Sequence, residues 1–169
     1  MDVKTYIQQQ MANARAQVDT VLKGLTDEQF NWLPPGTINP ISAILVHTLA
    51  GEDFFIQTVL QGKPRCWETQ EWGRSIGIQA PPGPAGGWDE FKTLQLLIPP
   101  VLAYQHVIWD ATDRFLADLT PEGLDRQVNF AGRQVSVAEM LIISVVHTAS
   151  HAGEIAAVKG MQGIQGLPF

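Results

Sequence analysis

Three of the four histidines in this 169-residue chain have the sequence spacing of metal ligands. His147 and His151 stand four residues apart in an apolar segment, and in a helix that spacing puts both imidazoles on one face, about one turn apart. His47 lies in a second apolar segment among small residues, which leave room for a bound species. Inward-facing imidazoles without partners are costly. The pattern therefore favours a divalent metal held by His47, His147 and His151, over three hydrogen-bonded core histidines.

The residues around the histidine pair limit the reactions that a metal site here could catalyse. The motif HTASH has Thr148 where metalloproteases of the HExxH type carry a glutamate base, so that protease class is excluded. Glu154, a candidate catalytic residue, follows His151 by three positions and falls near the same face. It could be a fourth ligand, an acceptor for an imidazole N–H, a general base or a charge at the rim, and we favour the acceptor. Because imidazoles alone discriminate weakly among metals, nickel, zinc, iron and manganese all remain candidates.

Other reactive side chains are predicted to play no part in the site. His106 lies on a polar helical stripe and is expected to face solvent. No motif surrounds Cys66, so we interpret it as an incidental thiol and not as a nucleophile. Glu52 and Asp53 follow His47 by five and six positions, which turns them off its face, and they are predicted to be surface charges.

Apolar periodicity predicts the elements that must position these residues. Four helices are expected at about 3–24, 40–61, 88–118 and 136–160, the third with a kink near residue 97 caused by Pro99 and Pro100. Ser136 and Glu139 form a capping box at the start of the last helix. A small hairpin-like loop is expected at 128–135.

The second and third helices are joined by a segment in which glycine and proline are frequent. In residues 62–87 we expect neither helix nor strand to persist, and we interpret the segment as a crossover along the length of the molecule. A crossover of this kind makes the second and third helices parallel. The sequence thus predicts one all-α domain over residues 1–169, a four-helix bundle.

Charge and composition exclude several classes of partner. Eleven Lys and Arg against seventeen Asp and Glu give a net charge of -6, which argues against nucleic acid. The start MDVKTYIQQQ lacks the pattern of a secretory signal, so a cytoplasmic location is expected. The longest apolar stretch, residues 140–146, is far shorter than the roughly 20 residues of a membrane span, and no membrane association is expected.

Two segments resemble the DinB-like (DNA-damage-inducible) superfamily: NPISAILVHTLAGEDFFI and GRQVSVAEMLIISVVHTASHAGEIAAVKG. The resemblance extends over nearly the whole chain, including LTPEGLDRQV. It implies an up-down-down-up bundle, a homodimer, and a divalent metal on three histidines that correspond to His47, His147 and His151. Members of this superfamily often have Gln at the position of Glu154 and His or Arg at that of Ala152, so the site here is less basic than usual.

Characterised members of that superfamily include metal-dependent S-transferases and an isomerase that use thiols such as bacillithiol, mycothiol or glutathione. We therefore expect a metal-dependent enzyme with a small-molecule substrate, a thiol S-transferase with a low-molecular-weight thiol as cosubstrate. Two alternatives stay open. The same metal could activate water, which would make the protein a hydrolase, or the bundle could bind a ligand or partner without catalysis, its histidines being vestigial.

Overall fold

The computed structural model describes residues 1–83 and 86–168, and most of them are helical, which confirms the predicted all-α class. The long elements are α1 (Val3–Leu22), α3 (Ile41–Asp53) with its π-helical continuation η1 (Phe54–Leu60), α7 (Ile98–Asp118) and α9 (Val137–Met161). The short ones are α2 (Asp27–Asn31), α4 (Cys66–Thr69), α5 (Trp72–Ile76), α6 (Trp88–Phe91), α8 (Pro121–Asp125), β1 (Gln127–Phe130) and β2 (Arg133–Ser136).

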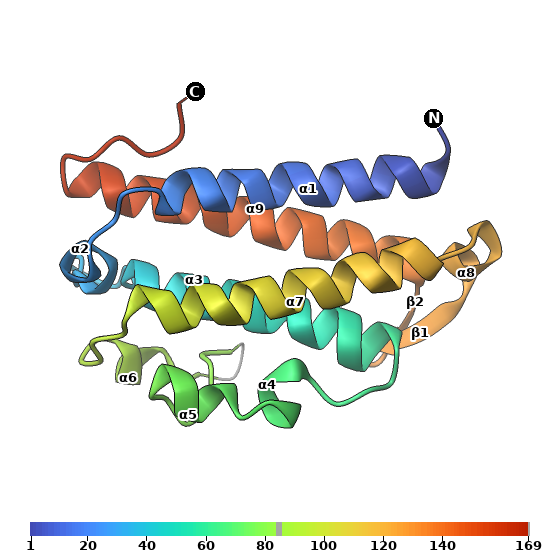
Figure 1. The fold of residues 1–169 in the computed structure, drawn as a ribbon, viewed down its shortest axis with the longest axis horizontal. Coiled ribbons are helices and arrows are strands. Elements are labelled where there is room, and N and C mark those ends of the chain that lie inside the picture. Colours follow the sequence, from blue (N-terminus) through green and yellow to red (C-terminus); the bar gives the residue numbers. More distant parts are fainter. Residues whose placement is uncertain (84–85, 169) are drawn as a thin grey trace.

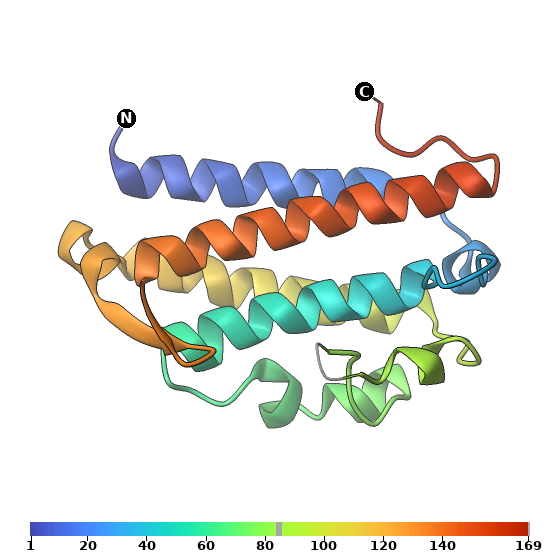
Figure 2. The same cartoon turned by 180° about the vertical axis from the view of Figure 1, so that it is seen from behind.

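The long helices lie lengthwise beside one another (Figures 1 and 2). The chain runs in one direction along α1 and α9 and in the opposite direction along α3 and α7. The connection from the end of η1 to the start of α7 returns along the side of α3 and α7 that faces away from α1 and α9. It therefore crosses the length of the molecule, as the glycine- and proline-rich composition predicted.

Two predictions about the middle of the chain were wrong. The third long helix does not start at residue 88 or bend near 97, because α7 begins at Ile98 and has Pro99 and Pro100 in its first turn. Proline costs no hydrogen bond in a first turn, so the pair starts the helix instead of kinking it. The crossover, in turn, contains the short helices α4 and α5, although no helix was expected there.

The elements before and at the start of α9 agree with the sequence. The hairpin pairs β1 with β2 in antiparallel register, and Ala131 and Gly132 at its turn both have positive φ. Ser136 then caps α9: its hydroxyl accepts from the Glu139 N–H at 3.1 Å, and the Glu139 carboxylate accepts from the Ser136 N–H at 2.7 Å. The capping box therefore fixes the helix that carries two of the three histidines.

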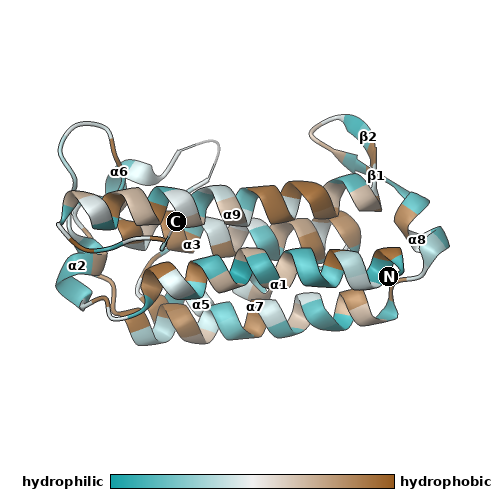
Figure 3. Ribbon diagram, turned by 90° about the horizontal axis from the view of Figure 1, so that it is seen from above, coloured by the Kyte–Doolittle hydropathy of each residue, from teal (hydrophilic) through white to brown (hydrophobic). Residues whose placement is uncertain are grey.

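Among the residues that the structure describes, two helical stretches are long and apolar enough to cross a membrane by length and composition: Ile41–Leu60, with mean hydropathy 1.2, and Val137–Met161, with 1.4. Within the protein, 72% of the apolar window of the first is buried, against 33% for the second. Figure 3 shows the hydrophobic residues gathered in the half of α9 next to the hairpin. The sequence argument considered only short, nearly continuous apolar stretches, whereas the mean over a longer window also includes the polar residues between them.

The predicted surface position of Glu52 was wrong. Its side chain is buried between α3 and its neighbours, where it accepts from the Arg15 guanidinium at 2.5 Å and from the Thr112 hydroxyl at 2.8 Å. Arg15 also pairs with Asp113 at 2.7 Å and lies over the Trp109 ring. This buried charge is tolerated because a cation and a hydroxyl satisfy it, and it joins α1 and α7 to α3.

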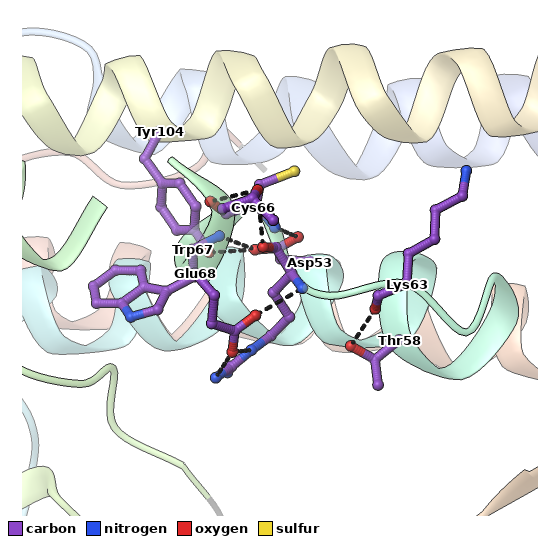
Figure 4. A network of polar contacts seen from close by, with 9 residues as sticks. Asp53, Thr58, Lys63, Cys66, Trp67, Glu68 and Tyr104 are labelled. Atoms are coloured by element: carbon purple, nitrogen blue, oxygen red, sulfur yellow. Dashed lines mark hydrogen bonds and ion pairs between the residues drawn. The ribbon is translucent and has the colours of Figure 1, made fainter. Parts of the chain in front are cut away.

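The prediction that Asp53 is a surface charge was also wrong, since none of this residue is exposed to solvent. Figure 4 shows its carboxylate between the start of α4 and Tyr104. It accepts from the backbone N–H groups of Cys66 and Trp67 and from the Tyr104 hydroxyl, each at 2.9 Å. Three charge-assisted hydrogen bonds replace the lost hydration and fasten the crossover to α3 and α7.

Candidate metal centre

The structure brings together the three histidines singled out from the sequence. One nitrogen from each of His47, His147 and His151 can be chosen such that all three lie within 4.8 Å of one another. His47 comes from α3, and the other two come from α9, one turn apart. The pairwise distances between ring centroids are 4.5 to 5.1 Å. Two packed helices thus place three imidazoles around one point, although their sequence separation is about one hundred residues.

Two of the three rings are oriented by an acceptor. His47 Nδ1 lies 2.9 Å from the backbone oxygen of Pro82, and His151 Nδ1 lies 2.8 Å from Glu154 Oε2. A carbonyl and a carboxylate can only accept, so Nδ1 carries the hydrogen in both rings, and in the neutral form of such a ring the lone pair is on Nε2. Glu154 makes the contact expected of an acceptor for an imidazole N–H, while its part in catalysis stays a prediction.

His147 is the least constrained of the three rings. Its Nε2 lies 3.2 Å from His47 Nε2, and its buried Nδ1 has no hydrogen-bond partner among residues 1–83 and 86–168. Burial, followed by the neighbouring His151 and His47, lowers the pKa of His147 to about 3, and burial also lowers the pKa of His47. Both rings are therefore neutral at pH 7, which is the form that binds metals. A neutral His147 ring has a lone pair to offer, and its Nδ1 has no partner in the described protein, so the ring is suited to bind a cation.

Gly51 makes the close approach of His147 to α3 possible. A Cβ added at Gly51 would lie 2.6 Å from His147 Cε1 and 3.2 Å from its Nδ1. Ordinary contacts between such atoms are about 3.5–4.0 Å, so any larger side chain would displace the ring. The sequence showed that small residues stand on the His47 face, but it could not show which of them the other helix approaches.

A cavity of 620 Å³ opens beside His47 and His147, and we call it the aromatic cavity. Its described lining comprises His47, Ala50, Gly51, Phe54, Phe55, Arg65, Pro81, Pro82, Gly83, Trp88, Phe130 and His147. The Trp88 ring lies 4.7 Å from that of His47, and the Phe55 ring lies 5.5 Å from that of His147. The phenylalanines of η1 and the hairpin were not identified from the sequence, because only the packed structure brings them to the histidines.

The remaining candidates lie away from the three histidines. His106 is exposed on α7, as predicted. Cys66 is buried, and burial together with Asp53 raises the pKa of its thiol to about 11, so the thiolate needed for nucleophilic attack is scarce at pH 7. The crossover residues Trp67 and Trp72 pack against Tyr104, at 5.4 and 5.5 Å between ring centroids.

Comparisons with known proteins bear on the fold and the family of this chain. No curated protein matches the sequence. A solved structure described as the conserved protein of locus from Enterococcus faecalis has a TM-score of 0.79 at 17% identity, covering 94% of this chain and 96% of that one. A second, described as the sibling lethal factor precursor DfsB, has a TM-score of 0.58 at 14% identity, covering 95% and 97%. At such identities the likeness shows the fold alone. The family profile of the DinB superfamily matches residues 10–155, so the chain belongs to the DinB superfamily.

Proposed function

We propose that this protein is a divalent-metal-dependent S-transferase that joins a low-molecular-weight thiol to a small electrophile. The observation that carries the proposal is the cluster of three imidazoles beside the aromatic cavity, two of them oriented by a hydrogen bond at Nδ1. The framework we infer is the up-down-down-up four-helix bundle, supported by the directions of the long helices in Figures 1 and 2.

His47, His147 and His151 are the residues that would hold the ion. Because three neutral imidazoles add no negative charge, a bound divalent ion would keep its full charge and would lower the pKa of a thiol that binds to it. Pro82 and Glu154 would hold two of the rings in the orientation that this requires. Glu154 is thus proposed as a positioning residue, through His151.

In the transfer itself, the thiol sulfur forms a bond to an electrophilic carbon of the substrate. The bond from that carbon to its leaving group breaks, the leaving group departs with the electron pair, and the thiol proton passes to solvent. The protein contributes an apolar environment from Phe55 and Trp88, which line the cavity beside the histidines and exclude water. Cys66 takes no part, because the attacking sulfur belongs to the cosubstrate.

The first test is metal content, measured by elemental analysis on protein purified without a histidine tag. About one divalent ion per chain is expected, with a large loss in His147→Ala. His106→Ala is the matched control, since this histidine is exposed on α7, and it should retain the metal. Equal metal content in the wild type and in His147→Ala would refute the proposed site.

The second test is turnover with a panel of low-molecular-weight thiols and a chromogenic chloronitrobenzene, which releases chloride. Metal-dependent turnover above the uncatalysed rate is expected, abolished by His47→Ala and unchanged in His106→Ala. Turnover that persists without metal would contradict the mechanism. Hydrolysis of ester or amide substrates without thiol turnover would favour the hydrolase, and metal binding without either activity would favour the ligand-binding alternative.

The oligomeric state, the location and the partners of the protein stay predictions. We propose a homodimer in the cytoplasm that acts on a small molecule and has neither nucleic acid nor membrane as partner. The net charge of -6 supports the exclusion of nucleic acid. Light scattering tests the dimer, and the mass of a single chain across working concentrations would refute it.

A further inference from the structure

We propose that the aromatic cavity binds the electrophile and selects a planar aromatic compound with one carboxylate, the ring lying among the aromatic side chains and the carboxylate pairing with Arg65. The inference rests on the proposed function, because it assigns one of the two reactants in that reaction. It goes further by naming the chemical class of that reactant and the residues that recognise it.

The apolar part of the cavity suits a flat ring. Phe54 lines it with 38% of its surface exposed, so a ligand would cover an aromatic side chain that now faces solvent. Phe55 and Phe130 stand edge to face, with centroids 5.7 Å apart. Aromatic pairs in such offset or edge-to-face arrangements add to the free energy of burial. A volume of 620 Å³ falls within the range of about 300–1,000 Å³ typical of small-molecule sites.

The polar part of the cavity suits a single negative charge. Among the described residues of the lining, Arg65 is the one with a permanent charge. Its guanidinium is paired with Glu68, whose side chain is 46% exposed, and pairs at the surface contribute little because water screens them. A planar guanidinium binds a carboxylate through two parallel hydrogen bonds. A ligand carboxylate in the more apolar cavity can therefore compete with Glu68.

Asp53 fixes the position of Arg65 relative to the histidines. The two residues after Arg65, Cys66 and Trp67, donate their backbone N–H groups to the buried Asp53 carboxylate, which belongs to the same helix as His47 (Figure 4). The start of α4 is therefore fastened to α3. As a result, the backbone that carries the cation is held to the helix that carries the first imidazole.

The test is isothermal titration calorimetry on the metal-free protein, with naphthoate as the probe and naphthylmethanol as its uncharged counterpart. Naphthoate should bind more tightly. Arg65→Gln should weaken the binding of naphthoate by about 10-fold or more, which is the contribution of a hydrogen-bonded charge pair. The affinity for naphthylmethanol should stay unchanged. Arg74→Gln is the matched control, because Arg74 is exposed on α5 in the same crossover and does not line the cavity.

Two further variants separate recognition from a loss of structure. Glu68→Gln removes the competitor of the ligand carboxylate, so naphthoate should bind a few-fold more tightly, a gain that misfolding cannot produce. Phe54→Ala should weaken both probes by about 10-fold because both lose the same aromatic contact. Tyr6→Ala is its control, an exposed aromatic residue on α1 outside the cavity.

The outcomes distinguish this inference from the proposed function. Equal binding of both probes to the wild type, or the same naphthoate affinity in Arg65→Gln and Arg74→Gln, would overturn the inference even if the protein contains metal and turns over thiols. Conversely, selective naphthoate binding that follows Arg65, Glu68 and Phe54 would support it even if elemental analysis finds no metal.

Discussion

Replacing Gly51 with alanine should separate the stability of α3 from the geometry of the metal centre. In the interior of a helix, Gly→Ala ordinarily stabilises by up to about 1 kcal/mol. Here the new methyl group would lie 2.6 Å from His147 Cε1, at least about 0.9 Å inside an ordinary contact. Because that atom belongs to the end of a side chain beside a cavity, the ring can turn away and the protein should still fold.

The cost should appear in metal affinity. Metal–ligand distances tolerate deviations of only about 0.2 Å, so a ring that retreats by roughly 1 Å is lost as a well-placed ligand. We expect the dissociation constant for the metal to rise at least about 10-fold in Gly51→Ala, which corresponds to about 1.4 kcal/mol. The melting temperature of the metal-free variant, in contrast, should equal or exceed that of the wild type.

Gly153→Ala is the matched control for this experiment. Gly153 lies in α9 between His151 and Glu154, is exposed, and has no atom within 4 Å of its added Cβ. It should gain helix stability without losing metal affinity. Competition with a chromophoric chelator measures the affinity, and NMR of the His147 ring in metal-free protein should show its environment changed in Gly51→Ala alone. Equal affinities and equal His147 spectra for the two variants would refute the reasoning.

Four other outcomes are expected. The metal-free protein should lose stability to urea as the pH falls below about 6.5, because the unfolded chain then takes up a proton on residue 147 that the folded chain, with its His147 pKa of about 3, does not. The free energy of unfolding should fall by up to about 1.4 kcal/mol per pH unit, and this dependence should shrink in His147→Asn. Native Cys66, with its pKa raised to about 11, should resist alkylation at pH 8 and become reactive in urea. Glu154→Gln should reduce metal affinity or turnover by about 10–100-fold in titration and rate assays. Chelation should leave the helical circular dichroism signal intact, since the apolar core needs no metal.

The sequence was sufficient to predict that His47, His147 and His151 lie close together. Each lies in a long apolar segment, and the inward faces of two apolar helices in one small domain have few places to meet other than each other. The capping box at Ser136 was equally readable because both of its hydrogen bonds join residues only three positions apart. Features that depend on one segment and its own caps are accessible from sequence in this way.

Other features depend on which segments pack together. The periodicity of residues 88–118 continues through Pro99 and Pro100, and only the observed start of α7 shows that a proline pair opens a helix instead of bending one. The side chain of Asn31 in α2 binds the backbone of Leu96 through both its amide nitrogen and its oxygen, each at 2.8 Å. This contact joins positions 65 residues apart, and it fixes the loop that separates α6 from α7 within the helix predicted at 88–118.

The buried acids show why position relative to a site residue is a poor guide to exposure. Consecutive residues of a helix point about 100° apart, so residues that leave the face of His47 turn toward other neighbours, and they meet solvent only if no neighbour is there. At one turn of α3, Gly51 faces His147 on α9, Glu52 faces Arg15 and Thr112 on α1 and α7, and Asp53 faces the crossover. Surrounded on all these sides, α3 has no polar face to give to water. The same turn that admits the His147 ring therefore also carries the two charges that fasten the rest of the protein around it.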